Sequence, residues 1–259
     1  MFWVFKFKNV VKVLVAIIAV ITVTVTAAVG QSVTAANYGV RKLPVYGVDR
    51  GDKTVALTFD AAWGADKTDK ILEILDEYGA KATFFLVGFW LDDYPDEVKK
   101  IDAAGHEIGN HSKNHLNMSG LDKSEQVKEI TSVNEQIKNL TGKTPRFFRP
   151  PFGDYNNSLI ESVEQQSMIA VQWSVDSLDW KGLSAAQIAD RVLAKVTDGS
   201  IILCHNNSDH IVEALPLILI GLENKGYKPV TMSELVYTEN YSIDNNGIQH
   251  LNNQGKQEE

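Results

Sequence analysis

Two histidines, His111 and His115, lie four positions apart and are the most conspicuous candidates for metal chemistry in the chain. Imidazoles at this spacing can face one point from a helical turn or a tight loop, and neutral imidazole is the commonest protein ligand for zinc-like metals. The same spacing fits many surface helices, so it is a weak signal by itself. The preceding residues 105–110 form a short apolar run flanked by Gly and Asn, which is typical of a strand that ends in a loop. The pair is therefore a candidate metal site at a strand end.

The elements that must position this pair follow from an alternation of strand-like and helix-like segments. The strand-like segments are 54–59, 82–87, 147–149, 169–173, 200–204 and 227–231. The segments with helical character are 67–78, 95–104, 123–140, 158–166, 184–196 and 211–225. Gly79 and Gly142 are placed to end two of the helices, and Ser184 is placed to cap another. Such alternation predicts an α/β fold with a mostly parallel sheet.

Chemically capable side chains lie at or just after the carboxyl ends of these predicted strands. They are Asp60, His111, Arg149, Asp179 and His205. In a parallel sheet or barrel those ends share one face, where active sites are built. We therefore expect five positions that are distant in the sequence to converge on one site.

The composition limits the class of protein. A length of 259 residues suits one large domain with a tail, or at most two small domains, and 44% hydrophobic residues are enough for a core. The net charge of -8 argues against nucleic-acid binding, which requires a basic patch. The single cysteine, Cys204, excludes an intramolecular disulfide and lies in a predicted buried strand, so we interpret it as a core residue.

The N-terminus has the pattern of an export signal. Lys6, Lys8 and Lys12 precede residues 13–29, which carry no charge. A basic region before an apolar stretch is typical of a signal peptide, but the stretch is also about long enough to span a bilayer. Residues 1–30 are thus a signal peptide or a membrane anchor, with a slight preference for the anchor. Either one places the body of the protein outside the cytoplasm.

The rest of the chain divides into three predicted parts. Residues 31–53 are expected to be a linker and residues 54–236 the functional domain. Residues 237–259 are rich in Asn, Gln, Glu and Ser, and are expected to be disordered.

Five short motifs, in this order, resemble those of polysaccharide deacetylases with a NodB-homology domain (carbohydrate esterase family four). They are Thr58-Phe59-Asp60, His111-Ser112-Lys113-Asn114-His115, Arg149-Pro150-Pro151-Phe152-Gly153, Asp176-Ser177-Leu178-Asp179-Trp180 and Leu203-Cys204-His205. The resemblance covers residues 54–235, and the motifs are highly specific in combination. In Trp63-Gly64 and Trp173-Ser174-Val175-Asp176-Ser177 the chain most resembles the membrane-anchored, sporulation-associated members.

The resemblance implies a fold and a reaction. The fold is a distorted (β/α) barrel with fewer than the usual eight repeats. The reaction is metal-assisted removal of acetyl groups from N-acetylated amino sugars. By match of position, Asp60 would be the general base and His205 the general acid. Arg149 would pair with and tune Asp60, and Asp179 would orient His205.

The resemblance also implies which residues contact the metal and the substrate. His111 and His115 would bind a divalent metal, with zinc the expected ion. Trp180 and Leu203 would form apolar walls around the acetyl group, and Phe152 would shape the groove.

Elementary chemistry agrees with these roles. Hydrolysis of an amide needs an activated water, a stabilised oxyanion and a proton for the leaving amine, and a divalent metal supplies the first two. A carboxylate beside an arginine has a lowered pKa and stays ionised, so it can accept a proton. A histidine paired with a carboxylate has a raised pKa, so it can serve as the acid.

One position departs from the family pattern. Family members carry a second aspartate where this chain has Ala61, and that aspartate is the third metal ligand. Alanine cannot coordinate, whereas catalytic zinc sites normally keep three protein ligands. Asp66 is close enough in the sequence to be considered as a substitute for this third metal ligand. Asp60 could also turn to the metal.

Taken singly, several of these residues also have a purely structural interpretation. Asp60 could be a helix N-cap, Arg149 a structural salt-bridge partner, and Asp176 a loop support. His106 and His210 match no motif and are assigned to structure or surface. The combination of motifs nevertheless favours a functional site.

The leading hypothesis is an exported, monomeric N-deacetylase that acts on a cell-wall glycan, most plausibly peptidoglycan, beside the membrane that anchors it. A second hypothesis is a glycan-binding protein of the same fold that has lost its full metal site. A third is a metal-dependent hydrolase of small cyclic amides, which the export signal disfavours.

Overall fold

The computed structural model describes residues 41–252. Residues 42–252 belong to one compact unit. The predicted signal or anchor, residues 1–30, and residues 31–40 of the predicted linker lie outside the described residues. Among residues 41–252, no helix is both long enough and apolar enough to cross a membrane.

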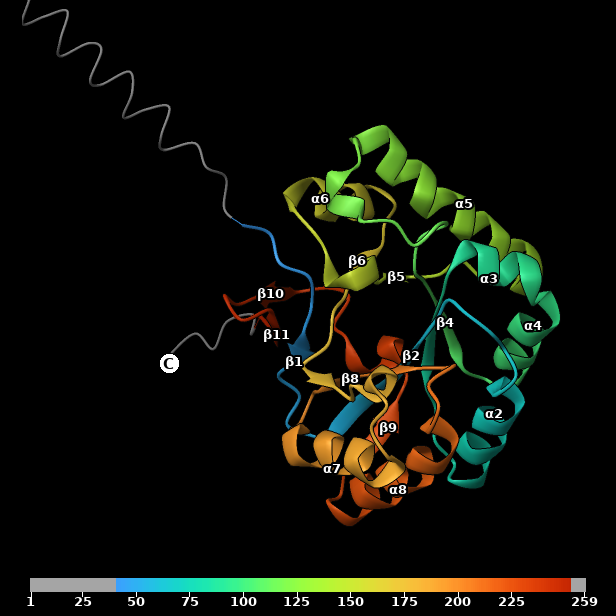
Figure 1. Ribbon diagram of the computed structural model, residues 1–259. Coiled ribbons are helices and arrows are strands. Elements are labelled where there is room, and N and C mark those ends of the chain that lie inside the picture. The colour runs from blue at the N-terminus through green and yellow to red at the C-terminus, as the bar shows by residue number, and fades with distance from the viewer. Residues whose placement is uncertain (1–40, 253–259) are drawn as a thin grey trace, which may run out of the picture. The chain divides into compact units, whose positions relative to one another are not determined.

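A parallel sheet forms the centre of the domain (Figure 1). Its strands lie in the order β6-β5-β4-β3-β2-β8-β7, and β9 also pairs with β2. Their bounds are β2 (Thr54–Ala61), β3 (Thr83–Leu86), β4 (Glu107–Asn110), β5 (Phe147–Phe148), β6 (Ile169–Ala170), β7 (Val175–Asp176), β8 (Ile201–His205) and β9 (Lys228–Val230). The chain before β2 bridges the two sides of the sheet, because Val45 pairs with Val171 beyond β6 and Gly47 with Ser200 before β8. The sheet therefore curls into the distorted barrel that was predicted.

Helices surround the outside of this sheet in an arc from α6 through α5, α3, α4 and α2 to α8 and α7 (Figure 1). Their bounds are α2 (Thr68–Glu77), α3 (Gly88–Asp93), α4 (Pro95–Ala103), α5 (Lys123–Thr141), α6 (Asn157–Gln165), α7 (Ala185–Lys195), α8 (Ile211–Asn224) and α9 (Met232–Leu235). Single 3-10 turns are η1 (Met118–Gly120), η2 (Pro151–Gly153) and η3 (Asp179–Lys181). The predicted helices are thus confirmed to within one or two residues at each end.

Local sequence signals set the helix ends. Ser184 caps α7 as expected, since its side chain accepts a hydrogen bond from the Gln187 amide. Gly142 ends α5 with a left-handed φ of 75°, a conformation that a residue without Cβ adopts at no steric cost.

The two faces of β2 explain how one strand serves both core and site. Phe59 and Ala61 belong to the hydrophobic cluster that includes the helices, whereas Ala56 belongs to the cluster inside the barrel. Because successive strand residues point to opposite faces, Thr58 and Asp60 face the barrel interior with Ala56. The polar end of this inner row reaches the carboxyl edge of the sheet.

The prediction that residues 237–259 are disordered is wrong for the part that the structure describes. Strands β10 (Tyr241–Ile243) and β11 (Ile248–Leu251) form a small sheet with β1 (Gly47–Val48), in the order β1-β11-β10. The expected linker and the expected tail therefore pair with each other. Gln249 is fully buried there and exchanges two hydrogen bonds with the Tyr237 backbone, at 2.7 and 2.6 Å. The polar composition of this segment gave no local sign of strands, because β11 pairs with β1, which is remote in the sequence.

Candidate active site

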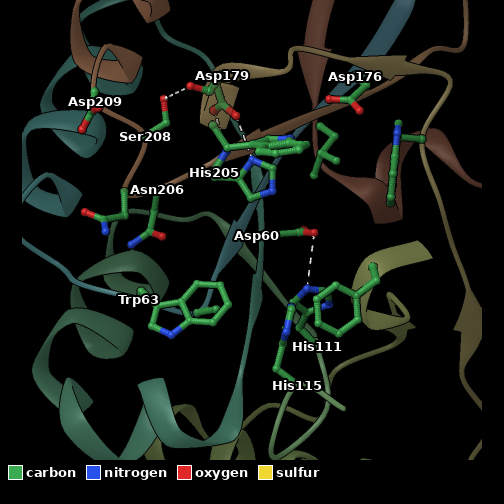
Figure 2. A pocket seen from close by; sticks show the side chains of 16 residues that line it. Asp60, Trp63, His111, His115, Asp176, Asp179, His205, Asn206, Ser208 and Asp209 are labelled. Atoms are coloured by element: carbon green, nitrogen blue, oxygen red, sulfur yellow. Dashed lines mark hydrogen bonds and ion pairs between the residues drawn. The ribbon is translucent and has the colours of Figure 1, made fainter. Parts of the chain in front are cut away.

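The carboxyl edge of the barrel holds a cavity of about 660 Å³. Of the five strand-end residues predicted to converge, Asp60, His111, Asp179 and His205 line it. The fifth, Arg149, is fully buried behind Asp60. Figure 2 shows Asp60 between His205 with Asp179 on one side and His111 with His115 on the other. The topology thus joins residues from β2, β8 and the segments that follow β4, β5 and β7.

Arg149 holds Asp60 in place as a carboxylate. Its Nη1 donates to Asp60 Oδ1 at 2.7 Å and to Thr58 Oγ1 at 2.9 Å, and its Nη2 donates to the Gln172 carbonyl at 3.1 Å. The guanidinium also lies 4.1 Å from the centre of the Phe85 ring. Burial by itself would raise the pKa of Asp60, but the positive charge of Arg149, aided by the histidines, outweighs it and lowers that pKa. Asp60 is therefore ionised at neutral pH and can accept a proton.

Asp179 holds His205 and favours its protonated form. Its Nδ1 donates to Asp179 Oδ1 at 2.8 Å, and its backbone amide donates to Asp179 Oδ2 at 2.8 Å. Burial by itself would lower the pKa of His205, but the hydrogen bond and charge of Asp179 outweigh it and raise that pKa. Because Nδ1 is engaged, Nε2 is the ring atom that remains to deliver a proton.

His111 and His115 lie with their ring centroids 5.0 Å apart. His111 Nδ1 donates to the Arg149 carbonyl at 2.7 Å, which leaves Nε2 as the other ring nitrogen, 3.4 Å from Asp60 Oδ2. Burial lowers the pKa of both rings, to about 4 for His115. Both are therefore neutral near pH 7, the form in which imidazole can coordinate a metal.

The donor set nevertheless does not complete a three-ligand metal site. Ala61 is buried in the hydrophobic core and offers only a methyl group. Asp66, the proposed substitute, is exposed and does not line the cavity. Asp60 is held by Arg149, and no cluster of three His, Cys, Asp or Glu suited to a metal occurs within residues 41–252. Two imidazoles are one protein ligand fewer than catalytic zinc normally keeps, so we assign no catalytic step to a metal.

The three residues predicted to contact the substrate, Phe152, Trp180 and Leu203, line the same cavity as Asp60 and His205. Phe152 and Trp180 are exposed by 65% and 59%, and Leu203 lies buried at the cavity wall. Phe152 has a left-handed φ of 60° and its ring contacts His115, with 4.5 Å between centroids. The resemblance placed these side chains at the groove, and the structure brings them there.

Other lining residues carry no role in the expected mechanism. They are Ala62, Trp63, Trp173, Asp176, Asn206, Asn207, Ser208 and Asp209. The sequence analysis interpreted Asp176 as a loop support. Asp176 does accept a hydrogen bond from the Leu178 amide at 2.9 Å, so it both supports its loop and lines the cavity. The signal that could have found the other lining residues is their position shortly after β2, β6 or β8.

The interpretation of His106 and Cys204 as structural residues is confirmed by their burial. His106 is buried away from the cavity, and its Nδ1 accepts a hydrogen bond from the Ala82 amide at 3.3 Å. Burial lowers the pKa of His106 to about 4, so the ring is neutral. Cys204 is fully buried, and burial raises the pKa of its thiol well above the ordinary range, which makes it unreactive.

Comparison with known proteins agrees with the motifs. The family model described as Polysaccharide deacetylase matches residues 47–171. A peptidoglycan-N-acetylglucosamine deacetylase of Bacillus cereus is 39% identical over 188 residues, which are 71% of this chain and 68% of that protein. The chain therefore belongs to the polysaccharide deacetylase family. The uncharacterized protein YlxY of Bacillus subtilis is 36% identical over 74% of this chain, and the chain spans only 60% of its length.

Among solved structures, a CE4 family pseudoenzyme from Bacillus anthracis is similar with a TM-score of 0.73. It is 33% identical, and the match covers 80% of this chain and 73% of that one. A mutant of this pseudoenzyme with restored enzymatic activity also has a TM-score of 0.73, at 35% identity over 76% of this chain and 72% of that one. The fold is thus shared with active and with inactive members.

Proposed function

We propose that this protein removes acetyl groups from N-acetylated amino sugars of a cell-wall glycan, peptidoglycan, outside the cytoplasm. One observation carries the proposal: Asp60, whose pKa is lowered, and His205, whose pKa is raised, face the same cavity. Groups with separated pKa values are the pattern of an acid–base pair. The peptidoglycan deacetylases among the relatives support the substrate class, and the uncharged N-terminal stretch after three lysines supports export.

In the proposed reaction, Asp60 Oδ2 takes a proton from a water whose oxygen forms a bond to the acetyl carbonyl carbon. Oδ1 stays on Arg149, which keeps the carboxylate oriented throughout. His205 Nε2 then donates its proton to the amide nitrogen as the C–N bond breaks, giving acetate and a free amine. Asp179 stabilises the charged imidazole before that transfer.

A second candidate function is glycan binding without turnover. Ala61 favours it, because the site has two imidazoles and lacks the carboxylate that would complete a catalytic metal site. The similarity to a pseudoenzyme supports the same alternative. Under this alternative, chelators leave glycan affinity unchanged and Asp60→Asn preserves function in cells.

Acetate release from purified peptidoglycan fragments tests the leading proposal. Wild type, with and without added zinc, cobalt or manganese, is expected to release acetate, and Asp60→Asn is expected to release none. No release under any of these conditions would reject deacetylation and leave glycan binding as the function.

Metal content of the purified chain, measured beside Ala61→Asp, separates the two candidates further. If the absent ligand limits turnover, Ala61→Asp raises both metal occupancy and acetate release. Ala61→Asn is the matched control, since it has nearly the same size without the negative charge. A metal-loaded Ala61→Asp variant that is no faster than wild type would show that the third ligand is not the limiting feature.

A further inference from the structure

Glu129 is a buried carboxylate on α5 that the proposed reaction does not use. It is 7% exposed and does not line the cavity. It lies on the packed face of α5 with Gln126, Ile130, Val133 and Ile137. Burial removes water from a carboxylate, which costs free energy unless hydrogen bonds replace that water. The partners of Glu129 therefore decide why a polar side chain occupies this position.

Both oxygens of Glu129 accept hydrogen bonds from a single residue, Asn114. Oε2 accepts from the Asn114 backbone amide at 2.8 Å, and Oε1 accepts from Asn114 Nδ2 at 2.5 Å. A carboxylate offers two acceptor oxygens and no donor, which matches two N–H groups of one residue. Asn114 directly precedes His115 in the loop 111–115. Glu129 thus holds, by main chain and side chain together, the loop that carries both histidines of the site.

The loop 111–115 has a backbone conformation that needs such support. Ser112 and His115 have left-handed φ angles of 66° and 52°. For residues with a Cβ this conformation costs free energy, and it persists only where the surrounding contacts fix it. The local contacts are the Ser112 amide, which donates to Asn110 Oδ1 at 2.8 Å, and the His115 amide, which donates to Ser112 Oγ at 3.0 Å. Neither of these bonds holds Asn114.

The start of α3 holds a different part of the same loop. The Gly88 amide donates to the Ser112 carbonyl at 2.9 Å, and the Phe89 amide donates to the Lys113 carbonyl at 3.3 Å. A Cβ at Gly88 would meet the Lys113 backbone at 2.9 Å, so this contact is close. The α3 contacts therefore fix Ser112 and Lys113, and Glu129 is the contact that fixes Asn114.

The placement of this loop matters for the proposed reaction. His111 Nδ1 donates to the Arg149 carbonyl, so Nε2 carries a lone pair, 3.4 Å from Asp60 Oδ2 (Figure 2). A water that gives one proton to Asp60 Oδ2 can donate its other O–H to His111 Nε2, and the two acceptors then orient it. At the other end of the loop, the His115 ring supports the Phe152 ring, with 4.5 Å between centroids. A displaced loop would misplace both the water and a wall of the groove.

We infer that Glu129 is a positioning residue of the site. Through Asn114 it fixes the loop 111–115, so that His111 lies beside Asp60 and His115 beside Phe152. The effect on rate rests on the proposed deacetylase function, whereas the placement of the two imidazoles can be measured without turnover.

The donors and acceptors of this pair define a set of variants. Glu129→Ala removes both acceptors and should release Asn114. Asn114→Asp sets a second carboxylate against Glu129 and should release the loop as well. The double variant Asn114→Asp with Glu129→Gln should restore the loop, because the new amide donates to the new carboxylate and still accepts from the backbone amide. Glu129→Gln alone should also keep the loop, since the Asn114 amide group can turn over and accept.

Two measurements on the full chain test the inference. Carbon–proton NMR correlation of the imidazole rings reports the surroundings of His111 and His115, and acetate release from peptidoglycan fragments gives kcat. Glu129→Ala and Asn114→Asp are expected to shift both ring signals and to lower kcat on the order of 100-fold, the scale for a small misplacement of reacting groups. The double variant and Glu129→Gln are expected to return both readouts towards wild type.

Gln126→Ala is the matched control on the same face of α5. Gln126 is fully buried and donates to the Met118 and Leu121 carbonyls at 3.0 and 3.2 Å, outside the loop 111–115. Its loss should lower stability and leave the signals of His111 and His115, and kcat, as in wild type. Asn114 is exposed, so Asn114→Asp still tests the inference if Glu129→Ala does not fold.

The outcomes separate this inference from the proposed function. Unchanged ring signals in Glu129→Ala and Asn114→Asp, or equal shifts in Gln126→Ala, would overturn the positioning role. Shifted signals with a wild-type kcat would overturn it too, because the loop would then not matter for the reaction. If wild type releases no acetate, the proposed function is rejected, while ring signals that shift in Asn114→Asp and return in the double variant still support the placement of the imidazoles by Glu129.

Discussion

Replacing Arg149 by methionine would leave the Asp60 carboxylate buried without its cation. The two side chains are 0% and 8% exposed, and they are joined by a 2.7 Å hydrogen bond. Two unit charges about 4 Å apart attract by about 4 kcal/mol at an effective dielectric constant of about 20. Breaking a buried pair from one side typically costs about 3–5 kcal/mol, because the remaining charge stays desolvated. We therefore expect Arg149→Met to lower the free energy of unfolding by about 3–5 kcal/mol.

The loss should depend on pH with a definite sign. In wild type the pKa of Asp60 is lowered, so its contribution to stability is present above the unfolded-state pKa of about 3.9 and is lost as pH falls. Without the Arg149 charge, burial dominates and raises the pKa of Asp60. The variant then gains stability as pH falls and the carboxylate is protonated. The stability difference between variant and wild type should therefore narrow from pH 7 towards pH 4.

Urea unfolding followed by circular dichroism at several pH values measures both effects. Arg146→Met is the matched control, since Arg146 is exposed three residues away, and it should change stability by no more than about 0.5 kcal/mol. Adding Asp60→Asn to Arg149→Met removes the orphan charge and should restore about 1–3 kcal/mol. The reasoning is refuted if Arg149→Met stays within about 1 kcal/mol of wild type, or if its deficit is the same at pH 4 and pH 7.

Three further expectations concern the acid, the small sheet and the thiol. Asp179→Asn should lower the pKa of His205 towards its ordinary value of about 6.5, which NMR titration would measure. The alkaline limb of the activity profile should move to lower pH with it, as rates measured against pH would show. An unchanged pKa of His205 would contradict its pairing with Asp179. Gln249→Ala should lower the free energy of unfolding by about 1–3 kcal/mol, because it leaves the Tyr237 backbone groups without their hydrogen-bond partners. Chemical denaturation measures this change. An unchanged free energy would mean that Gln249 does not stabilise the β1-β11-β10 sheet. Cys204 should resist iodoacetamide in the native chain and react only after unfolding, as mass spectrometry can measure; rapid native labelling would contradict its burial.

Much of the fold was predictable because its signals are local. The apolar spacing of Ile71, Ile74 and Leu75 marks α2 within a dozen residues, and Ser184 marks the start of α7 by a single cap. The strands of the barrel core are short apolar segments flanked by turn residues. Their alternation with helices implies parallel pairing, since a parallel connection requires a crossover.

The small sheet was not predictable in the same way. Strands β1 and β11 pair although about 200 positions separate them, as in the pairing of Gly47 with Ile248. Their stability comes from that pairing and from buried Gln249, and neither is visible in local composition. The polar residues between the strands therefore made a folded segment resemble a disordered tail.

By itself, the sequence determined the family, the order of the elements and the side chains available for acid–base chemistry. It also determined that position 61 has no carboxylate, because that is a matter of residue type. Only the tertiary structure decided the directions in which the pKa values of Asp60 and His205 are shifted. Arg149 and Asp60 are 89 positions apart, and Asp179 and His205 are 26 apart, so their mutual charges act only after folding. The tertiary structure also decided that Trp63 lines the cavity. Trp90 and Asn206 donate hydrogen bonds to the carbonyl of the next residue, Gly64, and so fix the loop that carries Trp63.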